Sequence, residues 1–182
     1  MDDEIGTDAI ATENKIEFFV PGIARPGGSK TGYVHPNTGK FVITPASKKT
    51  KPWMDTVAWI AQIVCKRMCL WTEPLLLTLV FYRPRAKDHF GTGRNAGKLK
   101  ASAPAYPTIV PDLTKLIRAT EDGLTGVVWR DDKQVVAQQT FKLYEDNNHK
   151  PGVLIRVERL DAMDYRRLLP VARETLFERI RA

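Results

Sequence analysis

The chain has 182 residues, enough to bury one substantial core, and 43% of them are hydrophobic, as in soluble globular proteins. No apolar run reaches the length of a membrane span, and the acidic start MDDEIGTDAIATENK does not resemble a secretory signal, so we expect a cytoplasmic protein. The net charge of +7 rises to +12 without the first fourteen residues, which hold five acids and no Lys or Arg; this excess favours a polyanionic partner, most often nucleic acid, over charge that serves solubility alone.

The first 45 residues predict a tail followed by three strands. Residues 1–14 contain little to bury and predict a disordered acidic tail. The stretch KIEFFVPG, residues 15–22, predicts a strand that Pro-Gly ends. In SKTGYVHPNTGKFVITP, residues 29–45, apolar residues flank PNTG and predict a hairpin.

A helix is expected over residues 47–68. Ser47 can cap it, although Pro52 favours a regular helix that starts nearer Trp53. Both Trp53 and Trp59 are expected to pack this helix against the core. Its apolar stripe consists of Val57, Ile60, Ala61 and Val64.

The two cysteines, Cys65 and Cys69, do not indicate a disulfide framework. We interpret them as buried thiols in a reducing compartment. A partial metal site is the alternative, but no histidine stands at zinc-ligand spacing from them.

A buried strand is predicted for PLLLTLVFYRP, residues 74–84, and the segment that follows it has a different composition. Residues 84–108 show no hydrophobic period and are rich in Gly, Ala, Ser and Pro. We interpret this interval as a long, mobile, basic loop that contacts DNA, with a tolerated insertion as the alternative. Its basic residues, set against a single acid, are Arg85, Lys87, Arg94, Lys98 and Lys100.

The remaining elements complete one α+β domain over residues 15–160, with a small mixed or antiparallel sheet packed by helices. QVVAQQTFKLYED, residues 134–146, and GVLIRVERL, residues 152–160, predict two strands joined by a turn. Residues 161–182 predict a basic terminal helix. A further helix, residues 113–124, has one buried face made by Leu113, Leu116, Ile117, Thr120 and Leu124.

Acidic residues stand at both ends of PDLTKLIRATEDGLTGVVWRDD, residues 111–132. Asp112 precedes the helix, and Asp131 and Asp132 follow it. Carboxylates in a basic protein suit a divalent cation held against a phosphate, if the chain brings both ends to one cleft. The alternatives are a helix cap for Asp112 and a turn for the aspartate pair.

Arg118 lies on the helix face opposite the leucines, together with Thr114, Glu121 and Thr125. An exposed pair with Asp122, four residues on, is the structural interpretation. The functional interpretation is a fixed positive charge that stabilises a phosphate in the transition state.

The block PDLTKLIRATEDGLTGVVWRDDKQVV, residues 111–136, resembles the RusA family of Holliday junction resolvases. That family has an Asp-Leu-Asp-Asn-Leu run entering a helix, then a basic residue, Asp-Ala-Leu, and a Trp with paired aspartates before Gln-Val-Val. Here Asp112 matches the first aspartate and residues 122–124 match Asp-Ala-Leu. The closing block is matched by Trp129, Asp131, Asp132, Gln134, Val135 and Val136.

The resemblance implies a homodimeric endonuclease that cuts four-way DNA with Mg²⁺ or Mn²⁺, in the cytoplasm of a bacterium or of a phage-infected host. By resemblance, Asp112 and Asp132 are metal ligands, with Asp131 beside them and Asp122 a less certain member. Arg118 stands where the family has a catalytic lysine; it keeps the charge but does not release a proton. Beyond the loop, Lys115 is expected to bind DNA.

One position departs from the family pattern, because Thr114 replaces the second aspartate of Asp-Leu-Asp. The site would then work with fewer carboxylates, recruit another acid such as Asp122, Glu121 or Glu17, or be degraded. The alternative function is accordingly a non-catalytic protein that binds branched DNA. A basic RNA-binding protein is a weaker third interpretation, since no aromatic-glycine motif of the RNA-binding sheet type is present.

Overall fold

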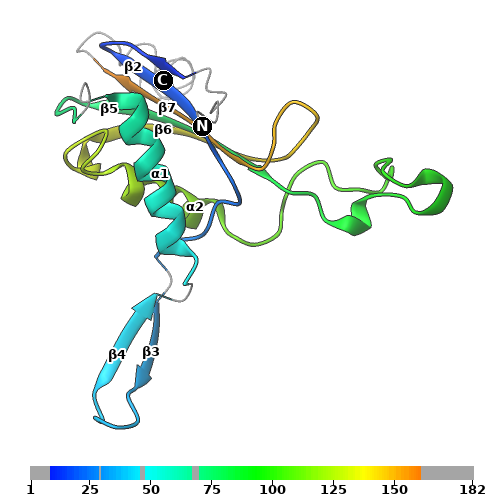
Figure 1. Ribbon diagram of the computed structural model, residues 1–182, viewed down its shortest axis with the longest axis horizontal. Helices are drawn as coiled ribbons and strands as arrows, with labels where there is room; N and C mark the ends of the chain where they lie inside the picture. Colours follow the sequence, from blue (N-terminus) through cyan, green and yellow to red (C-terminus); the bar gives the residue numbers. More distant parts are fainter. Residues whose placement is uncertain (1–8, 29, 46–47, 67–69, 161–182) are drawn as a thin grey trace, which may run out of the picture.

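In the computed structural model, the described residues are 9–28, 30–45, 48–66 and 70–160 (Figure 1). They confirm the predicted single α+β domain. Its main sheet has the strand order β1-β2-β7-β5-β6, in which β5 and β6 are parallel and all other neighbours are antiparallel. The strands are β1 (Ile10–Ala11), β2 (Lys15–Pro21), β5 (Leu75–Arg83), β6 (Val135–Tyr144) and β7 (Gly152–Arg159).

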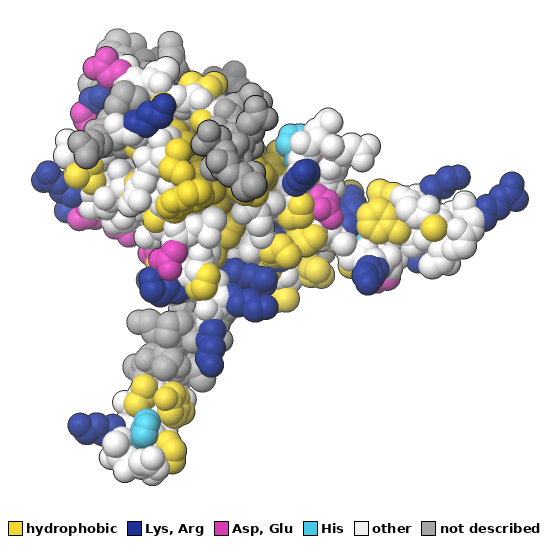
Figure 2. Space-filling model, viewed as in Figure 1, with side chains coloured by type: hydrophobic (Ala, Val, Ile, Leu, Met, Phe, Trp, Pro, Cys, Tyr) yellow, Lys and Arg dark blue, Asp and Glu magenta, His cyan; other side chains and the backbone are white. Residues whose placement is uncertain are grey.

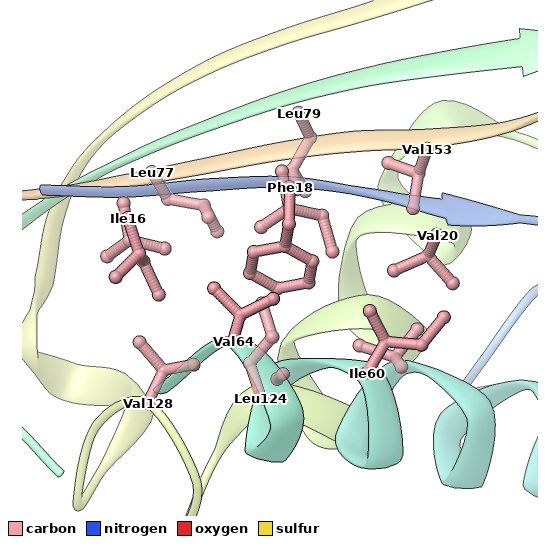
Figure 3. Packing of buried hydrophobic residues seen from close by; sticks show 14 of the residues in the cluster. Ile16, Phe18, Val20, Ile60, Val64, Leu77, Leu79, Leu124, Val128 and Val153 are labelled. Carbon is pink, nitrogen blue, oxygen red and sulfur yellow. The ribbon is translucent and has the colours of Figure 1, made fainter. Parts of the chain in front are cut away.

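Two helices, α1 (Thr50–Cys65) and α2 (Leu113–Leu124), cover one face of this sheet. Figure 3 shows the hydrophobic core between these helices and the sheet. Alternate residues of β2, β5 and β7 point into the core, so the period-2 pattern of each strand places its apolar side chains together. Each fully buried Leu, Val or Phe contributes about 1.5–3 kcal/mol. The labelled core residues include Ile16, Phe18, Val20, Leu77, Leu79, Leu124 and Val153.

The two last predicted strands both form, but β6 and β7 do not pair with each other. They lie on opposite sides of β5, with β6 parallel and β7 antiparallel to it. The long connection through residues 84–134 includes α2 and permits the parallel pairing of β5 with β6. This connection places α2 alongside the outermost strand, β6.

The helices match their predicted stripes closely. In α1, Val57, Ile60, Ala61 and Val64 are all buried. The helix starts at Thr50, three residues earlier than Trp53, because proline is tolerated in a first helical turn. Ser47 lies outside the described residues.

The prediction for the two tryptophans of α1 is half right. The Trp53 side chain is 5% exposed, whereas that of Trp59 is 55% exposed and does not pack in the core.

The helices α1 and α2 approach closely at Gly123, where an added Cβ would lie 2.9 Å from the Met54 carbonyl oxygen and 3.0 Å from Val57 Cβ.

Three further predictions concern chain ends and cysteines. The sheet begins before the expected boundary, because β1 pairs with β2 within the region assigned to the tail. Cys65 is buried but takes part in a disulfide, so the expectation of a thiol is wrong there. Cys69 and the predicted helix 161–182 lie outside the described residues.

Two segments project from the body in Figure 1. One is the predicted hairpin, β3 (Lys30–Val34) paired with β4 (Phe41–Pro45). The other is the basic interval 84–108, whose 3-10 turns η1 (Lys87–His89) and η2 (Gly93–Asn95) are held by internal hydrogen bonds such as Gly91 N to Lys98 O at 2.9 Å. This interval is irregular but has local structure of its own.

Candidate functional site

Helix α2 carries the first predicted ligand at its start. Asp112 occupies the N-cap position, yet its side chain makes no capping hydrogen bond. Its carboxylate instead pairs with Lys115 Nζ at 3.1 Å, and both side chains are about half exposed. The carboxylate therefore stays accessible and is not committed to capping.

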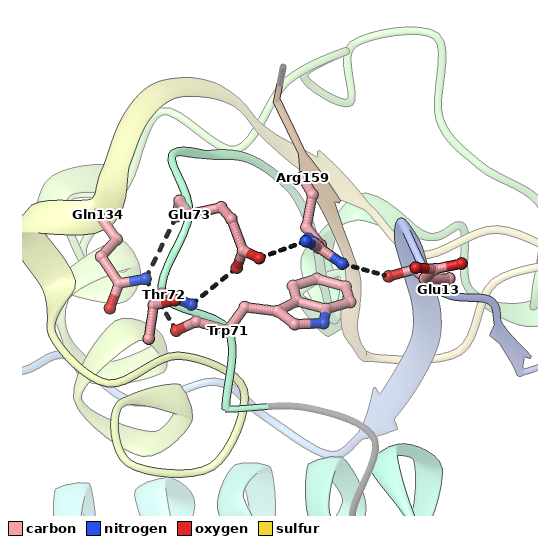
Figure 4. Close-up of polar contacts among 6 residues, drawn as sticks. All are labelled: Glu13, Trp71, Thr72, Glu73, Gln134 and Arg159. Carbon is pink, nitrogen blue, oxygen red and sulfur yellow. Dashed lines mark hydrogen bonds and ion pairs between the residues drawn. The ribbon is translucent and has the colours of Figure 1, made fainter. Parts of the chain in front are cut away.

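The second acidic group is held in place by Gln134 (Figure 4). The Gln134 amide nitrogen donates to the carbonyls of Trp71 and Glu73, at 2.8 and 3.2 Å. Its amide oxygen accepts from the backbone N–H groups of Arg130 and Asp131, at 3.1 and 2.9 Å. One side chain thereby ties the turn that bears the aspartate pair to the segment that leads into β5.

The two aspartates of that turn differ in role. Asp131 caps the 3-10 turn η3 (Asp132–Gln134), accepting from Lys133 N at 3.1 Å, which agrees with the structural interpretation of the pair. The Lys133 side chain hydrogen-bonds to it and lowers the pKa of Asp131. Asp132 is exposed at the outer side of the turn.

Acidic residues from α2 lie within electrostatic range of Asp132. Burial raises the pKa of Glu121, and the negative charges of Asp132 and Asp122 raise it further. The Glu121 carboxylate accepts a hydrogen bond from Gln138 of β6, which partly opposes this effect. Glu121, Asp122 and Asp132 thus form one negative region near the C-terminal end of α2.

The structure places Asp112 and Asp132 toward opposite ends of α2. Lys142 Nζ, far along β6, donates to the carbonyls of Ile109 and Pro111 at 2.9 and 3.0 Å, whereas Asp132 lies just before β6 begins. A helix of twelve residues is about 18 Å long. Among the described residues, no three Asp, Glu, His or Cys side chains come together as a metal-binding group.

Arg118 lies midway along α2, at the base of the β3–β4 hairpin. An added Cβ on Gly28 would lie 3.1 Å from Arg118 Cδ, and one on Gly27 would lie 3.0 Å from the Ala119 backbone nitrogen. Gly27 N also donates to the Lys115 carbonyl at 2.7 Å. Glycines at these positions therefore let the chain that enters the hairpin pack directly on α2.

Three other residues named from the sequence differ in their exposure. Thr114 is exposed in the first turn of α2. Glu17 is ion-paired with Arg156 and Lys15 in the sheet, and these two ion pairs give its carboxylate a structural role. Trp129 is fully buried and donates to Thr125 Oγ1 at 3.0 Å, so it packs the core and is not available to stack on a base.

The basic interval presents most of its charges to solvent, and Figure 2 shows Lys and Arg side chains along this projection and at its junction with the body. Lys87, Arg94 and Lys98 are exposed. Lys100 donates to the Asp88 carbonyl at 2.8 Å. The Arg85 side chain is engaged within the protein, because its guanidinium lies 4.2 Å from the centre of the Tyr144 ring and donates to the Pro104 carbonyl.

Two contributors to the site were not identified from the sequence. In the sequence, Gln134 is identifiable only as part of the block that resembles the family, and Gln138 falls within a predicted strand. Their roles depend on which segments are adjacent in space. A glutamine three residues after an aspartate, as Gln134 is after Asp131, is nevertheless a local signal for a capped turn, since its amide reaches back to the backbone.

Comparison with known proteins places this site in context. The family model described as Endodeoxyribonuclease RusA matches residues 24–158, which include both acidic groups, Arg118 and the basic interval. The chain is also 27% identical over 139 residues to the Uncharacterized protein YqaN of Bacillus subtilis (strain 168), with 76% of this chain and 89% of that protein covered. No described helix is long and apolar enough to cross a lipid bilayer.

Proposed function

Because the chain belongs to the RusA family of endodeoxyribonucleases, we propose that it cuts four-way (Holliday) DNA junctions by paired nicks during recombination and repair. The observation that carries this proposal is the family match over residues 24–158, which includes Asp112, Arg118 and Asp132. The exposed basic interval and the positive charge of the chain support binding to DNA phosphates.

The proposed cofactor is Mg²⁺ or Mn²⁺, and the residues of one described chain supply only part of a site for it. Mg²⁺ commonly takes one or two carboxylates together with water and substrate oxygens. Asp132 has Glu121 and Asp122 nearby, but Asp112 lies at the other end of the helix. When bound, the ion would activate water and offset charge on the scissile phosphate.

We therefore propose that a second copy of the chain completes each site. In a two-fold dimer, residue i of one copy meets residue j of the other, and the reverse contact follows by symmetry. If the α2 helices of two copies run antiparallel, Asp112 of each copy approaches Asp132 of the other. Such a dimer has two equivalent sites, as paired nicking requires.

The open edge of β6 is the surface that we propose for this dimer. Within the described residues, β6 pairs with β5 alone, and exposed long edges normally need protection. The Val136 and Phe141 side chains of this strand are 61% and 51% exposed. Antiparallel pairing of β6 across a two-fold axis would cover these side chains and run the adjacent α2 helices antiparallel.

Arg118 and Lys115 would hold the substrate, since both project from the exposed side of α2. A guanidinium serves as a fixed positive charge, so we assign Arg118 to electrostatic stabilisation of the phosphate and not to proton transfer. Its side chain passes close to Gly28, where an added Cβ would lie 3.1 Å from Arg118 Cδ.

The test is incubation of purified protein with a labelled four-way junction in Mg²⁺, in Mn²⁺ and in EDTA. Symmetric nicks in opposing strands that disappear in EDTA are expected. Salt-sensitive junction binding without cutting in either metal would instead support a binding protein. The binding protein is favoured by Thr114, which replaces an aspartate of the family pattern, and by the separation of Asp112 from Asp132. In that case Thr114→Asp would be expected to restore cutting.

A further inference from the structure

The β3–β4 hairpin is apolar on both faces. Tyr33 lies opposite Val42, and Val34 lies opposite Phe41. Opposite residues of an antiparallel pair share a face and successive residues alternate, so the two pairs point in opposite directions. The Phe41 ring lies over Gly32, where an added Cβ would be 2.3 Å from the ring.

These apolar side chains are exposed. The exposed fractions of Tyr33, Val34 and Phe41 are 45%, 61% and 68%. The hairpin stands away from the sheet and helices in Figure 1, and Figure 2 shows several yellow side chains on the part of it that is not drawn in grey. A two-stranded hairpin alone is marginally stable in water, so this geometry indicates a partner that contacts both faces.

The charge around the hairpin identifies the chemistry of that partner. Residues 18–54 contain six basic residues and no Asp or Glu. A second copy of this chain would bring a similar excess of positive charge against them, whereas DNA brings phosphates. A two-stranded ribbon also fits the major groove, which is about 12 Å wide.

The hairpin is anchored beside the proposed catalytic helix. Gly27 N donates to the Lys115 carbonyl at 2.7 Å, and Thr50 Oγ1 donates to the Pro26 carbonyl at 2.7 Å. These contacts tie the chain on one side of the hairpin to α2 and to the first turn of α1. DNA held at Arg118 is therefore at the root of the hairpin.

We propose that the β3–β4 hairpin is a DNA-binding wedge that enters the branch of a four-way junction and stacks Tyr33 and Phe41 on bases exposed there. This inference rests on the proposed junction substrate and assigns a new contact surface for it. Aromatic rings on two faces stack on bases on both sides of the ribbon, which a continuous duplex does not expose. The wedge thus distinguishes branched from linear DNA.

The experiment uses full-length protein in EDTA, so that binding is measured without cutting. The DNA is a four-way junction with 2-aminopurine in the base pair next to the crossover, and a linear duplex of equal length is the comparison. Wild-type protein is expected to raise 2-aminopurine fluorescence as the base unstacks. The Tyr33→Ser, Phe41→Ser double variant is expected to lose this rise and to bind the junction about ten-fold more weakly or worse.

Three controls separate stacking from charge and from folding. Duplex affinity and the salt dependence of junction binding are expected to be unchanged in the double variant, because no phosphate contact is removed. Lys40 is an exposed basic residue directly before β4, and Lys40→Gln is expected to reduce the salt slope by about one through loss of a phosphate contact. Trp59→Ser, which alters an exposed aromatic residue of α1, is expected to behave as wild type.

Each contrary outcome has a distinct meaning. A double variant that binds the junction and raises fluorescence like wild type would overturn the wedge while leaving junction cutting intact. A double variant that sediments at half the wild-type mass would show that the hairpin binds a second copy. Wild-type protein that neither binds nor cuts four-way DNA would refute the proposed function itself.

Discussion

Two inactive variants of this protein are expected to restore activity to each other. Asp112→Asn and Asp132→Asn each remove one carboxylate from every proposed site. In a heterodimer of the two variants, one composite site contains both substitutions and the other contains neither. Sites built within single chains would give no intact site in that heterodimer.

The expected size of the effect follows from the separation of the aspartates. Metal–oxygen bonds are about 2.0–2.6 Å long, whereas the α2 helix between the two acidic groups is about 18 Å long. A heterodimer purified with two different tags has one of two sites intact. It is therefore expected to make the first nick at about half the wild-type rate and to leave the opposing strand uncut.

The assay follows both strands of a four-way junction labelled with two dyes. A heterodimer of wild type with the Asp112→Asn, Asp132→Asn double variant is the matched control, because each of its composite sites contains one substitution. That control is expected to be inactive. If the control keeps half activity and the paired single variants show none, the ligands come from one chain and the composite site is refuted.

Four further outcomes are expected. Asp132→Asn as a homodimer should abolish cutting and retain junction binding by gel shift; loss of binding would contradict a ligand role. Gln134→Leu should lower the unfolding free energy by about 2–3 kcal/mol in urea titrations, since four side-chain hydrogen bonds to the backbone are lost; an unchanged midpoint would show that Gln134 does not stabilise this turn. The hydrogen bond from Arg156 lowers the pKa of Glu17, so that pair stabilises the fold fully above about pH 4.5 and its contribution is lost as the pH falls through the lowered pKa; Glu17→Gln should lower Tm at pH 7, and the difference from wild type should shrink as the pH falls below 4.5. Gly123→Ala should destabilise by about 1–3 kcal/mol although alanine favours helix, because its Cβ meets α1; a higher Tm would show that the helices can separate.

Local patterns predicted the elements well because each pattern reflects one element and its own buried face. The 3.6-residue spacing of Leu116, Thr120 and Leu124 located α2 with its observed ends, and strand alternation located β2, β5 and β7. The exposed Trp59 was misassigned because its position in α1 lies off the buried stripe that includes Val57 and Val64.

Relations between distant segments were not predictable in the same way. A chain that leaves α2 can return along the helix or continue beyond it, and residue types do not decide which. The placement of Asp112 and Asp132 at opposite ends depends on the parallel pairing of β6 with β5. The same pairing explains why the Gln134 and Gln138 contacts were missed.

The central position of β7 has a consequence for how the chain is made. This strand is the last described one, yet it lies between β2 and β5, which do not pair with each other. A nascent chain that ends before residue 152 contains both flanking strands without the strand that joins them. The sheet can close only after β7 leaves the ribosome, and until then β2 and β5 expose edges that chaperones would have to protect.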